Sequence, residues 1–136
     1  MMQLQGRVLN EGDVTAELLI LDEPLSFWGG FDSATGRIID KQHPQEGTQL
    51  TGKLVVMPGT RGSSGTPGVL GESLRLGTGP AGLILNKADI NVVAATVVVA
   101  ALYDLHCPVV LLEAEAFGCL VANQVCTVNS DGVVSF

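Results

Sequence analysis

The pattern of hydrophobic and polar positions changes character near residue 50 of this chain. Before that point, Leu4, Gly6 and Val8 alternate with polar residues, residues 10–13 read Asn-Glu-Gly-Asp, and residues 16–21 are mostly apolar. Alternation with a period of two, interrupted by turn-forming residues, is typical of strands in antiparallel sheets. The first part of the chain is therefore predicted to be antiparallel β-structure.

The central part of the chain contains short apolar runs at residues 54–57, 82–85 and 109–112. Continuous apolar runs of this length indicate strands that are buried on both faces, as in parallel sheets. The segments between the runs are long enough to hold a helix each, which a parallel crossover requires. The pattern predicts a βαβαβ unit.

The last part of the chain returns to β character. Residues 120–128 are predicted to form a strand, residues 129–132 (Asn-Ser-Asp-Gly) a turn, and residues 133–136 a final strand. The predicted fold class is thus α/β, with a central parallel βαβαβ unit flanked by antiparallel strands. A length of 136 residues predicts a single domain spanning residues 1–136.

Residues 92–102 are apolar throughout except for Thr96, and six of the eleven residues are β-branched. Periodicity alone does not distinguish a buried strand from a buried helix here. We favour a helix, because Asp89 or Asn91 can cap its start and residues 103–108 can form its exit. A helix that is apolar nearly all round is expected to be buried on more than one side. Its second side then faces either a partner or the interior of this domain.

A glycine-rich segment follows the apolar run at 54–57, and it places Arg61, Ser63 and Ser64 where the predicted strand ends. Glycines there let the backbone bend and aim N–H groups at an anion, and a helix is expected over residues 68–76. The segment lacks the lysine of a phosphate-binding loop and the G-x-S-x-G pattern of a hydrolase elbow. Two interpretations remain: a site for a substrate carboxylate or a deprotonated hydroxyl, and a turn whose serines cap the helix.

The segment at residues 24–40 is the second unusual region, because it carries the only tryptophan, Trp28, next to Phe27 and close to Phe31. Aromatic side chains beside glycines often mark an interface or the wall of a ligand site. The alternative is a loop that folds back over the core and is held there by Phe27 and Trp28. The sequence does not distinguish the two.

Charge and hydropathy exclude several classes of partner. The chain has 7 basic and 14 acidic residues, a net charge of −7, and its basic residues are scattered, so no basic stripe can follow a nucleic acid backbone. Its longest apolar run is shorter than the roughly 20 residues of a membrane-spanning helix, and its start lacks a signal-peptide pattern. We expect a cytoplasmic protein that binds neither nucleic acid nor membrane.

The cysteines and histidines do not form a recognisable metal or disulfide pattern. Cys107, Cys119 and Cys126 are odd in number and lack C-x-x-C spacing, so core packing is the favoured role for each. His43 and His106 are far apart in the sequence. Each is expected to be a surface or hydrogen-bonded structural histidine rather than a metal ligand.

Five segments, taken in order, resemble the small subunit of aconitase X-type dehydratases. They are residues 24–32 (Pro-Leu-Ser-Phe-Trp-Gly-Gly-Phe-Asp), 35–40, 43–44 (His-Pro), 61–64 (Arg-Gly-Ser-Ser) and 80–85. The resemblance implies the swivelling β/β/α domain of the aconitase superfamily. It also implies a large aconitase-like partner subunit that carries an iron–sulfur cluster or iron, with no cofactor bound by this chain.

The resemblance further implies roles for individual residues. Ser63 matches the serine that acts as catalytic base, with electrostatic support or substrate contacts from Arg61, Gly62 and Ser64. Ser26, Phe27 and Trp28 form a possible substrate or partner loop. An alkoxide strong enough to remove a proton from a carbon beside a carboxylate needs stabilisation by neighbouring charge and N–H dipoles.

Two substrates fit this family: cis-3-hydroxy-L-proline, which loses water to give a pyrroline carboxylate, and 5-phosphomevalonate. The aromatic loop at residues 27–31, His43-Pro44 and the scarcity of lysine and arginine near the site favour hydroxyproline. A non-catalytic partner-binding module is the alternative from a different class. The chain departs from the family pattern at Thr60, where a glycine is usual, at residues 65–67, which are usually richer in serine, and at Ala95, which is usually glycine.

Overall fold

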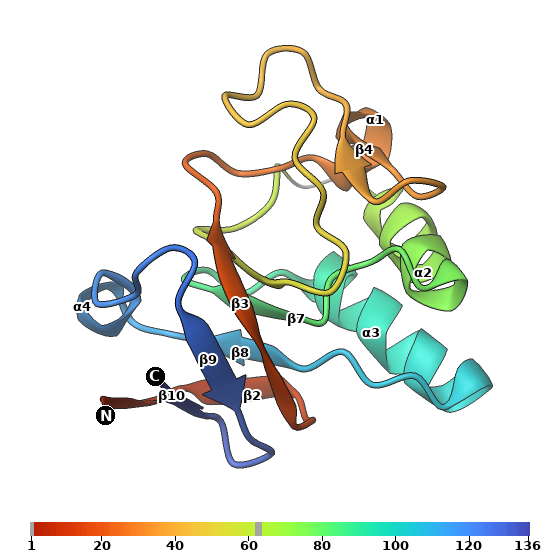
Figure 1. The fold of residues 1–136 in the computed structure, drawn as a ribbon. Helices are drawn as coiled ribbons and strands as arrows, with labels where there is room; N and C mark the ends of the chain where they lie inside the picture. The colour runs from red at the N-terminus through yellow and green to blue at the C-terminus, as the bar shows by residue number, and fades with distance from the viewer. Residues whose placement is uncertain (1, 62–63) are drawn as a thin grey trace.

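The computed structural model describes residues 2–61 and 64–136, and its centre is a parallel sheet (Figure 1). Four neighbouring strands run parallel in the order β3, β6, β7, β8. Their bounds are Val14–Ile20, Leu54–Met57, Gly82–Leu85 and Val109–Leu111. The predicted βαβαβ unit is confirmed, because buried apolar runs of this length leave little choice of structure.

Antiparallel strands flank the parallel unit on both sides. On one side β2 (Arg7–Asn10) pairs with β8, and on the other β9 (Val125–Val128) pairs with β3, followed by β10 (Val133–Ser135) and β1 (Gln3–Gln5). The strand order is β1-β10-β9-β3-β6-β7-β8-β2. Only Gly6 separates β1 from β2, so the sheet must curl until its two ends meet. The chain termini lie together, with the Met2 amide donating to the Phe136 carbonyl at 2.8 Å.

The sheet separates two hydrophobic clusters. Alternate residues of β6 point to opposite faces: Val55 and Met57 join one cluster under the helices, and Leu54 and Val56 join the other, inside the curl. This alternation is the ordinary geometry of a strand. Both faces of β6 are therefore buried, and chemistry on this strand is confined to its end.

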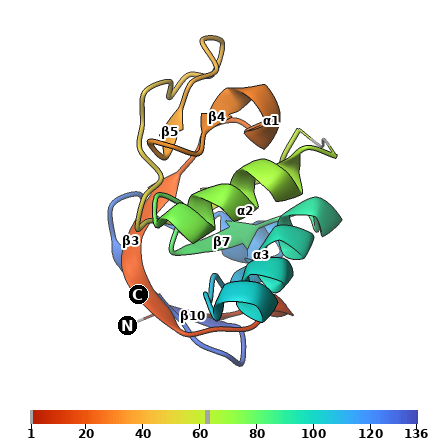
Figure 2. The ribbon, with the colours of Figure 1, turned by 90° about the vertical axis from the view of Figure 1, so that its right-hand side faces the viewer.

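Two helices lie side by side on one face of the sheet (Figure 2). They are α2 (Thr66–Leu76), which begins two residues before the predicted start, and α3 (Ile90–Tyr103), which confirms the helical interpretation of residues 92–102. Asp89 caps α3, as one of the two expected caps. At 14 residues α3 does not approach the length of a bilayer, and within the described residues no helix is long and apolar enough to cross a membrane.

Burial of α3 differs from the prediction. Val92, Ala95, Thr96 and Val99 face the core, whereas the opposite side of the helix is exposed, with Ile90 at 81%. The prediction of burial on more than one side is therefore wrong for this chain taken by itself. The apolar outer face of α3 is therefore not explained by burial in the interior of this domain.

The start of one predicted strand and the presence of four short elements were not apparent in the sequence. The strand predicted over residues 120–128 begins only at Val125, because the chain turns at Asn123, which has a φ of 68°, while Leu120 packs into the second cluster. The short elements α1 (Phe27–Gly30), β4 (Phe31–Asp32), β5 (Arg37–Ile38) and α4 (Ala114–Phe117) also lack a sequence signal. Elements of two to four residues are too short to show a period.

Candidate functional site

The glycine-rich segment leaves the sheet at the carboxyl end of β6, as predicted. Arg61 and Ser64 are both exposed there, whereas Gly62 and Ser63 lie outside the described residues. The segments that follow β3 and β7, residues 21–26 and 86–89, reach the same edge because the three strands are parallel. In open α/β sheets this edge is where ligands bind. Three loops distant in sequence therefore converge on the candidate site.

The segment after β7 holds the glycine-rich loop from one side. The Lys87 amide donates to the Pro58 carbonyl at 2.8 Å. The Thr60 hydroxyl donates to Oδ2 of Asp89. The other oxygen of Asp89, Oδ1, accepts from the amides of Asn91 and Val92 at 2.9 and 3.3 Å, so it caps α3. One carboxylate thus joins the loop to the start of a helix.

The segment after β3 holds the loop from the other side. The Arg61 amide donates to the Leu25 carbonyl at 3.2 Å, and Leu25 and Thr60 form a parallel bridge. The Arg61 guanidinium pairs with Glu23, with 2.9 Å between Nη2 and Oε1, on the surface. An exposed ion pair contributes about 0–1 kcal/mol. The guanidinium of Arg61 is therefore held weakly. An anion that binds it more tightly can replace Glu23 with little loss of stability.

His43 supports the segment that carries Glu23. It is buried, and its Nδ1 accepts from the Gln45 amide at 3.0 Å, which leaves Nε2 to donate to the Glu23 carbonyl at 3.1 Å. The Gln45 side chain adds bonds to the Asp22 amide at 2.8 Å and the Ile20 carbonyl at 2.9 Å. The prediction of a hydrogen-bonded structural histidine is confirmed for His43.

The aromatic segment folds back over the core, as one of the two interpretations predicted, but Phe27 holds it there and Trp28 does not. Phe27 is fully buried and packs edge-on against Phe31, with 5.3 Å between ring centroids, so it holds the segment on the core and does not face a ligand. Trp28 is 64% exposed. Its ring lies against Gly65, where an added Cβ would be 2.6 Å from Cε3, and the Ser26 hydroxyl donates to the Trp28 carbonyl at 2.9 Å. Trp28 therefore flanks the glycine-rich loop.

The start of α2 has backbone N–H groups and one buried hydroxyl next to the glycine-rich loop. Gly65 occupies the N-cap position, and no side chain of the described residues caps the helix. The Thr66 hydroxyl is buried without a hydrogen-bond partner among those residues. Ser64 does not cap the helix, so the interpretation of the loop as a turn with capping serines finds no support at this residue. Uncapped N–H groups at a helix start favour an anion.

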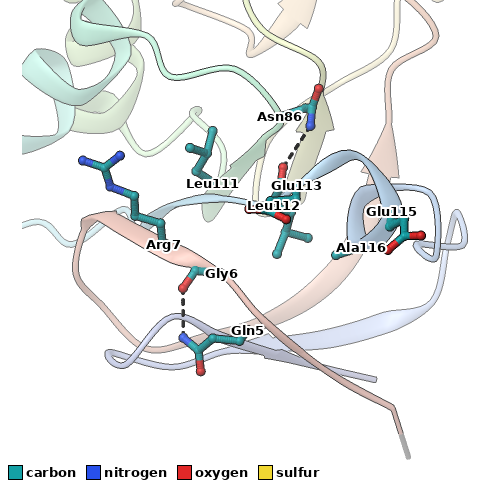
Figure 3. A pocket seen from close by; sticks show the side chains of 9 residues that line it. All are labelled: Gln5, Gly6, Arg7, Asn86, Leu111, Leu112, Glu113, Glu115 and Ala116. Atoms are coloured by element: carbon teal, nitrogen blue, oxygen red, sulfur yellow. Dashed lines mark hydrogen bonds between the residues drawn. The ribbon is translucent and has the colours of Figure 1, made fainter.

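A pocket of about 470 Å³ lies farther along the same edge, at the ends of β7 and β8 and the start of β2 (Figure 3). Arg7 lies on one side of it, and Glu113 and Glu115 lie toward α4 on the other. The Asn86 amide group donates to the Leu112 carbonyl at 2.9 Å and closes the wall between the two strands. Of the site residues predicted from the sequence, none that the structure describes lines this pocket.

The cysteines only partly follow the prediction of core packing. Burial raises the pKa of the Cys107 thiol to about 12 and that of Cys126 to about 11, because a thiolate is poorly solvated in the core. The prediction is confirmed for these two and wrong for Cys119, which is exposed. All three are free thiols. Among the described residues, no group of three or more His, Cys, Asp or Glu side chains is arranged to hold a metal ion.

Sequence reasoning missed Lys87 and Glu23. Lys87 is exposed, makes no ion pair with any described residue, and its Cβ lies 3.6 Å from where a Cβ on Gly59 would be. The scarcity of cations in the neighbouring sequence is therefore a poor guide to the charge at the site. The available signal was positional, since both residues follow directly on strands whose ends share one edge.

A curled mixed sheet, with two helices on one face and a glycine-rich loop at the end of its parallel strands, is the architecture of a swivelling β/β/α domain. The chain belongs to the family described as the aconitase X swivel domain, which it matches over residues 3–136. The structure of aconitase X from Thermococcus kodakaraensis has a similar fold, with a TM-score of 0.84 and 26% identity over 99% of this chain and 98% of that one. The resemblance and the predicted fold class are confirmed.

Relatives with two different names show similar identity. Cis-3-hydroxy-L-proline dehydratase of Hypocrea jecorina is 34% identical over 96% of this chain, but the chain spans only 22% of that protein. The phosphomevalonate dehydratase small subunit of Methanothermobacter thermautotrophicus is 38% identical over 65% of this chain and 67% of its own length. That of Methanopyrus kandleri is 43% identical over 58% of each chain. These relatives are dehydratases or their subunits.

Proposed function

We propose that this chain is the small, swivel-domain subunit of a hydro-lyase, and that Ser63 acts as its catalytic base. The observation that carries the proposal is the convergence of three loops at the carboxyl edge of the sheet, where Arg61 and Ser64 are exposed on either side of Ser63. The family and the dehydratase relatives support the reaction class. The loop follows the fully buried strand β6, so it is attached to a rigid part of the sheet.

In this proposal Ser63 takes a proton from the carbon next to the substrate carboxylate. The carbon–hydrogen electron pair forms a double bond to the neighbouring carbon, whose hydroxyl leaves with its bonding electron pair and takes up a proton to become water. Ser63 then gives up the proton that it gained, so that no net proton is consumed. The N–H groups at the start of α2, which no side chain of the described residues caps, favour the deprotonated serine. Arg61 exchanges its weak surface pair with Glu23 for the substrate carboxylate.

The proposal assigns the rest of the active site to a larger partner. The named small subunits among the relatives imply such a partner, and the chain spans only 22% of the Hypocrea jecorina protein. We propose that this partner carries the iron–sulfur cluster or iron that the family resemblance implies. The uncharged outer face of α3 begins at Ile90, next to Asp89 of the site. A partner that covers the site is therefore expected to extend along α3.

Hydroxyproline is the first substrate candidate, because the aromatic segment with Trp28 flanks the loop and the Hypocrea jecorina relative, which matches 96% of this chain, is named a cis-3-hydroxy-L-proline dehydratase. Phosphomevalonate is the second, and Lys87 favours it. A lysine beside Gly59 that forms an ion pair with no described residue can bind a phosphate. Replacing Lys87 by glutamine should raise KM for the phosphorylated substrate and leave KM for hydroxyproline unchanged.

The test is turnover of both substrates by this chain co-expressed with its large partner. Ser63→Ala should lower kcat by about a thousandfold or more, since it removes the base itself, and should keep the wild-type melting temperature. Ser130→Ala is the matched control and should retain activity, because this exposed serine bonds to Asp13 before the start of β3, away from the site. Full activity of Ser63→Ala would remove the base role. Full activity of the partner without this chain would favour a non-catalytic binding module.

A further inference from the structure

The loop that carries Arg61 has two side-chain bonds to other segments within its described part, residues 58–61, and they differ in character. Arg61 pairs with Glu23 at the surface, where solvent screens the interaction. Thr60 donates to Asp89 in a partly buried position. A shielded hydrogen bond to a carboxylate contributes more than an exposed ion pair. Thr60 is therefore the stronger attachment point of the loop.

Asp89 is itself firmly placed. Its Oδ1 accepts from two amides of the first turn of α3, and a carboxylate at this end is favoured by the helix dipole. The helix is anchored in the core by Val92, Ala95 and Val99. Oδ2 remains for Thr60. Because Asp89 is fixed at the start of the 14-residue helix α3, its bond to Thr60 fixes the loop relative to that helix.

We propose that Asp89 is a positioning residue, which acts through the Thr60 hydroxyl to fix the glycine-rich loop directly before Arg61. Gly59 gives the backbone directly before Thr60 wide conformational freedom, and the bond to Asp89 restricts it. Its catalytic consequence rests on the proposed function, because the loop must present a base and an arginine in one geometry. The tether itself is a property of this chain alone.

The experiment compares Thr60→Val with Thr60→Ser in the complex of this chain with its partner, and in the isolated chain. Valine keeps the shape of threonine and lacks the hydroxyl, whereas serine keeps the hydroxyl. Thr15→Val is the matched control, because it removes the exposed Thr15–Thr127 hydroxyl pair far from the site. Asp89→Ser is the second variant: serine still caps α3 but is too short to hold the loop as well.

Two measurements are made on each variant. Hydrogen exchange follows the Arg61 amide, which is bonded to Leu25. It should become about tenfold faster in Thr60→Val and Asp89→Ser, the factor expected for losing one hydrogen bond. Kinetics should show kcat lower by about tenfold with KM changed little, because the base is misplaced while binding remains. Thr60→Ser and Thr15→Val should match the wild type in both.

The outcomes separate this inference from the proposed function. Unchanged exchange of the Arg61 amide in Thr60→Val would overturn the tether, whatever the activity. Faster exchange with an unchanged kcat would overturn the positioning role. If Ser63→Ala is fully active while Thr60→Val still loosens the loop, the proposed base is wrong and the tether stands.

Discussion

The helices α2 and α3 lie side by side on the same sheet face, yet they differ at both ends and on their outer faces. α2 has no side-chain cap from the described residues at its start and ends in Gly77, whereas α3 starts with a capping aspartate and ends in Asp104. Glycine readily takes the left-handed conformation that both helices need at their ends, and aspartate takes it at a cost. Within the described residues, each helix therefore has a favourable cap at one end only.

The outer faces differ in charge. α2 presents Glu72 and Arg75, which form an ion pair, while α3 has no charged residue between Ile90 and Tyr103. Ile90, Ala94, Val97 and Ala101 follow one another on the outer side of α3 at helical spacing. A soluble chain seldom leaves such a stripe uncovered. The difference supports the proposal that a partner covers α3, whereas α2 meets solvent and the site loop.

The largest expected effect tests that assignment. Val97→Lys places a charge in the centre of the α3 stripe and should weaken binding to the large partner by more than about tenfold, because an unpaired charge in an apolar interface loses its water. Leu76→Lys on α2 is the control, since the two side chains are 48% and 47% exposed. Affinity is measured by titration calorimetry. Equal effects of the two substitutions would abolish the distinction between the helices.

The next effect concerns the helix starts. Asp89→Ala removes the cap of α3 and should lower the free energy of unfolding by about 1–2 kcal/mol. Asp89→Ser should recover the capping part of that loss, because a serine hydroxyl also accepts from the first-turn amides, but not the part due to the bond with Thr60. Urea denaturation of the isolated chain measures both. A loss of less than a few tenths of a kcal/mol in Asp89→Ala would show that the two helix starts do not differ energetically.

A smaller effect concerns the glycine at the start of α2. Gly65→Ala brings a Cβ into the Trp28 ring and should swing the exposed ring outward, whereas Gly68→Ala meets nothing within 4 Å. Trp28 is the only tryptophan of the chain, so acrylamide quenching of its fluorescence reports the change directly. Quenching should increase in Gly65→Ala and stay at the wild-type level in Gly68→Ala. The same quenching in both variants would contradict the packing of Trp28 on Gly65.

The smallest effect is expected at the end of α3. Asp104→Gly relieves a residue with a φ of 53° and removes a negative charge from the carboxyl end of a helix. It should raise the free energy of unfolding by about 0.5–1 kcal/mol, measured by urea denaturation. Asp104→Asn is the control for charge alone and should give a smaller gain. A loss of stability in Asp104→Gly would mean that the contact with His106 outweighs the strain.

Much of the fold was predictable because its signals are local. The strands at residues 54–57 and 82–85 match the apolar runs to the residue, and Asp89 was one of the two expected caps of α3. The strand that begins at Val125 was predicted five residues too early, because apolar residues in a packed turn and in a strand look the same in sequence.

The candidate site was predictable only in its location. Arg61 and Ser64 lie at the end of β6 as expected, whereas Glu23, Lys87 and Asp89 reach the loop from other strand ends. No motif marked them as neighbours. The assignment of Ser63 as base stays a prediction, because it rests on the family resemblance and lies outside the described residues.

The sequence by itself determined which segments form buried strands, that the uncharged segment is a helix, and that a glycine-rich loop follows a strand. Only the tertiary structure decided that Thr60 meets Asp89 across 29 residues, that Arg61 meets Glu23 across 38, and that one face of α3 is left exposed. The physical reason is the distance along the chain over which each kind of interaction acts. Backbone pattern and capping depend on residues within one or two turns, whereas strand order and helix packing depend on the burial of the whole chain.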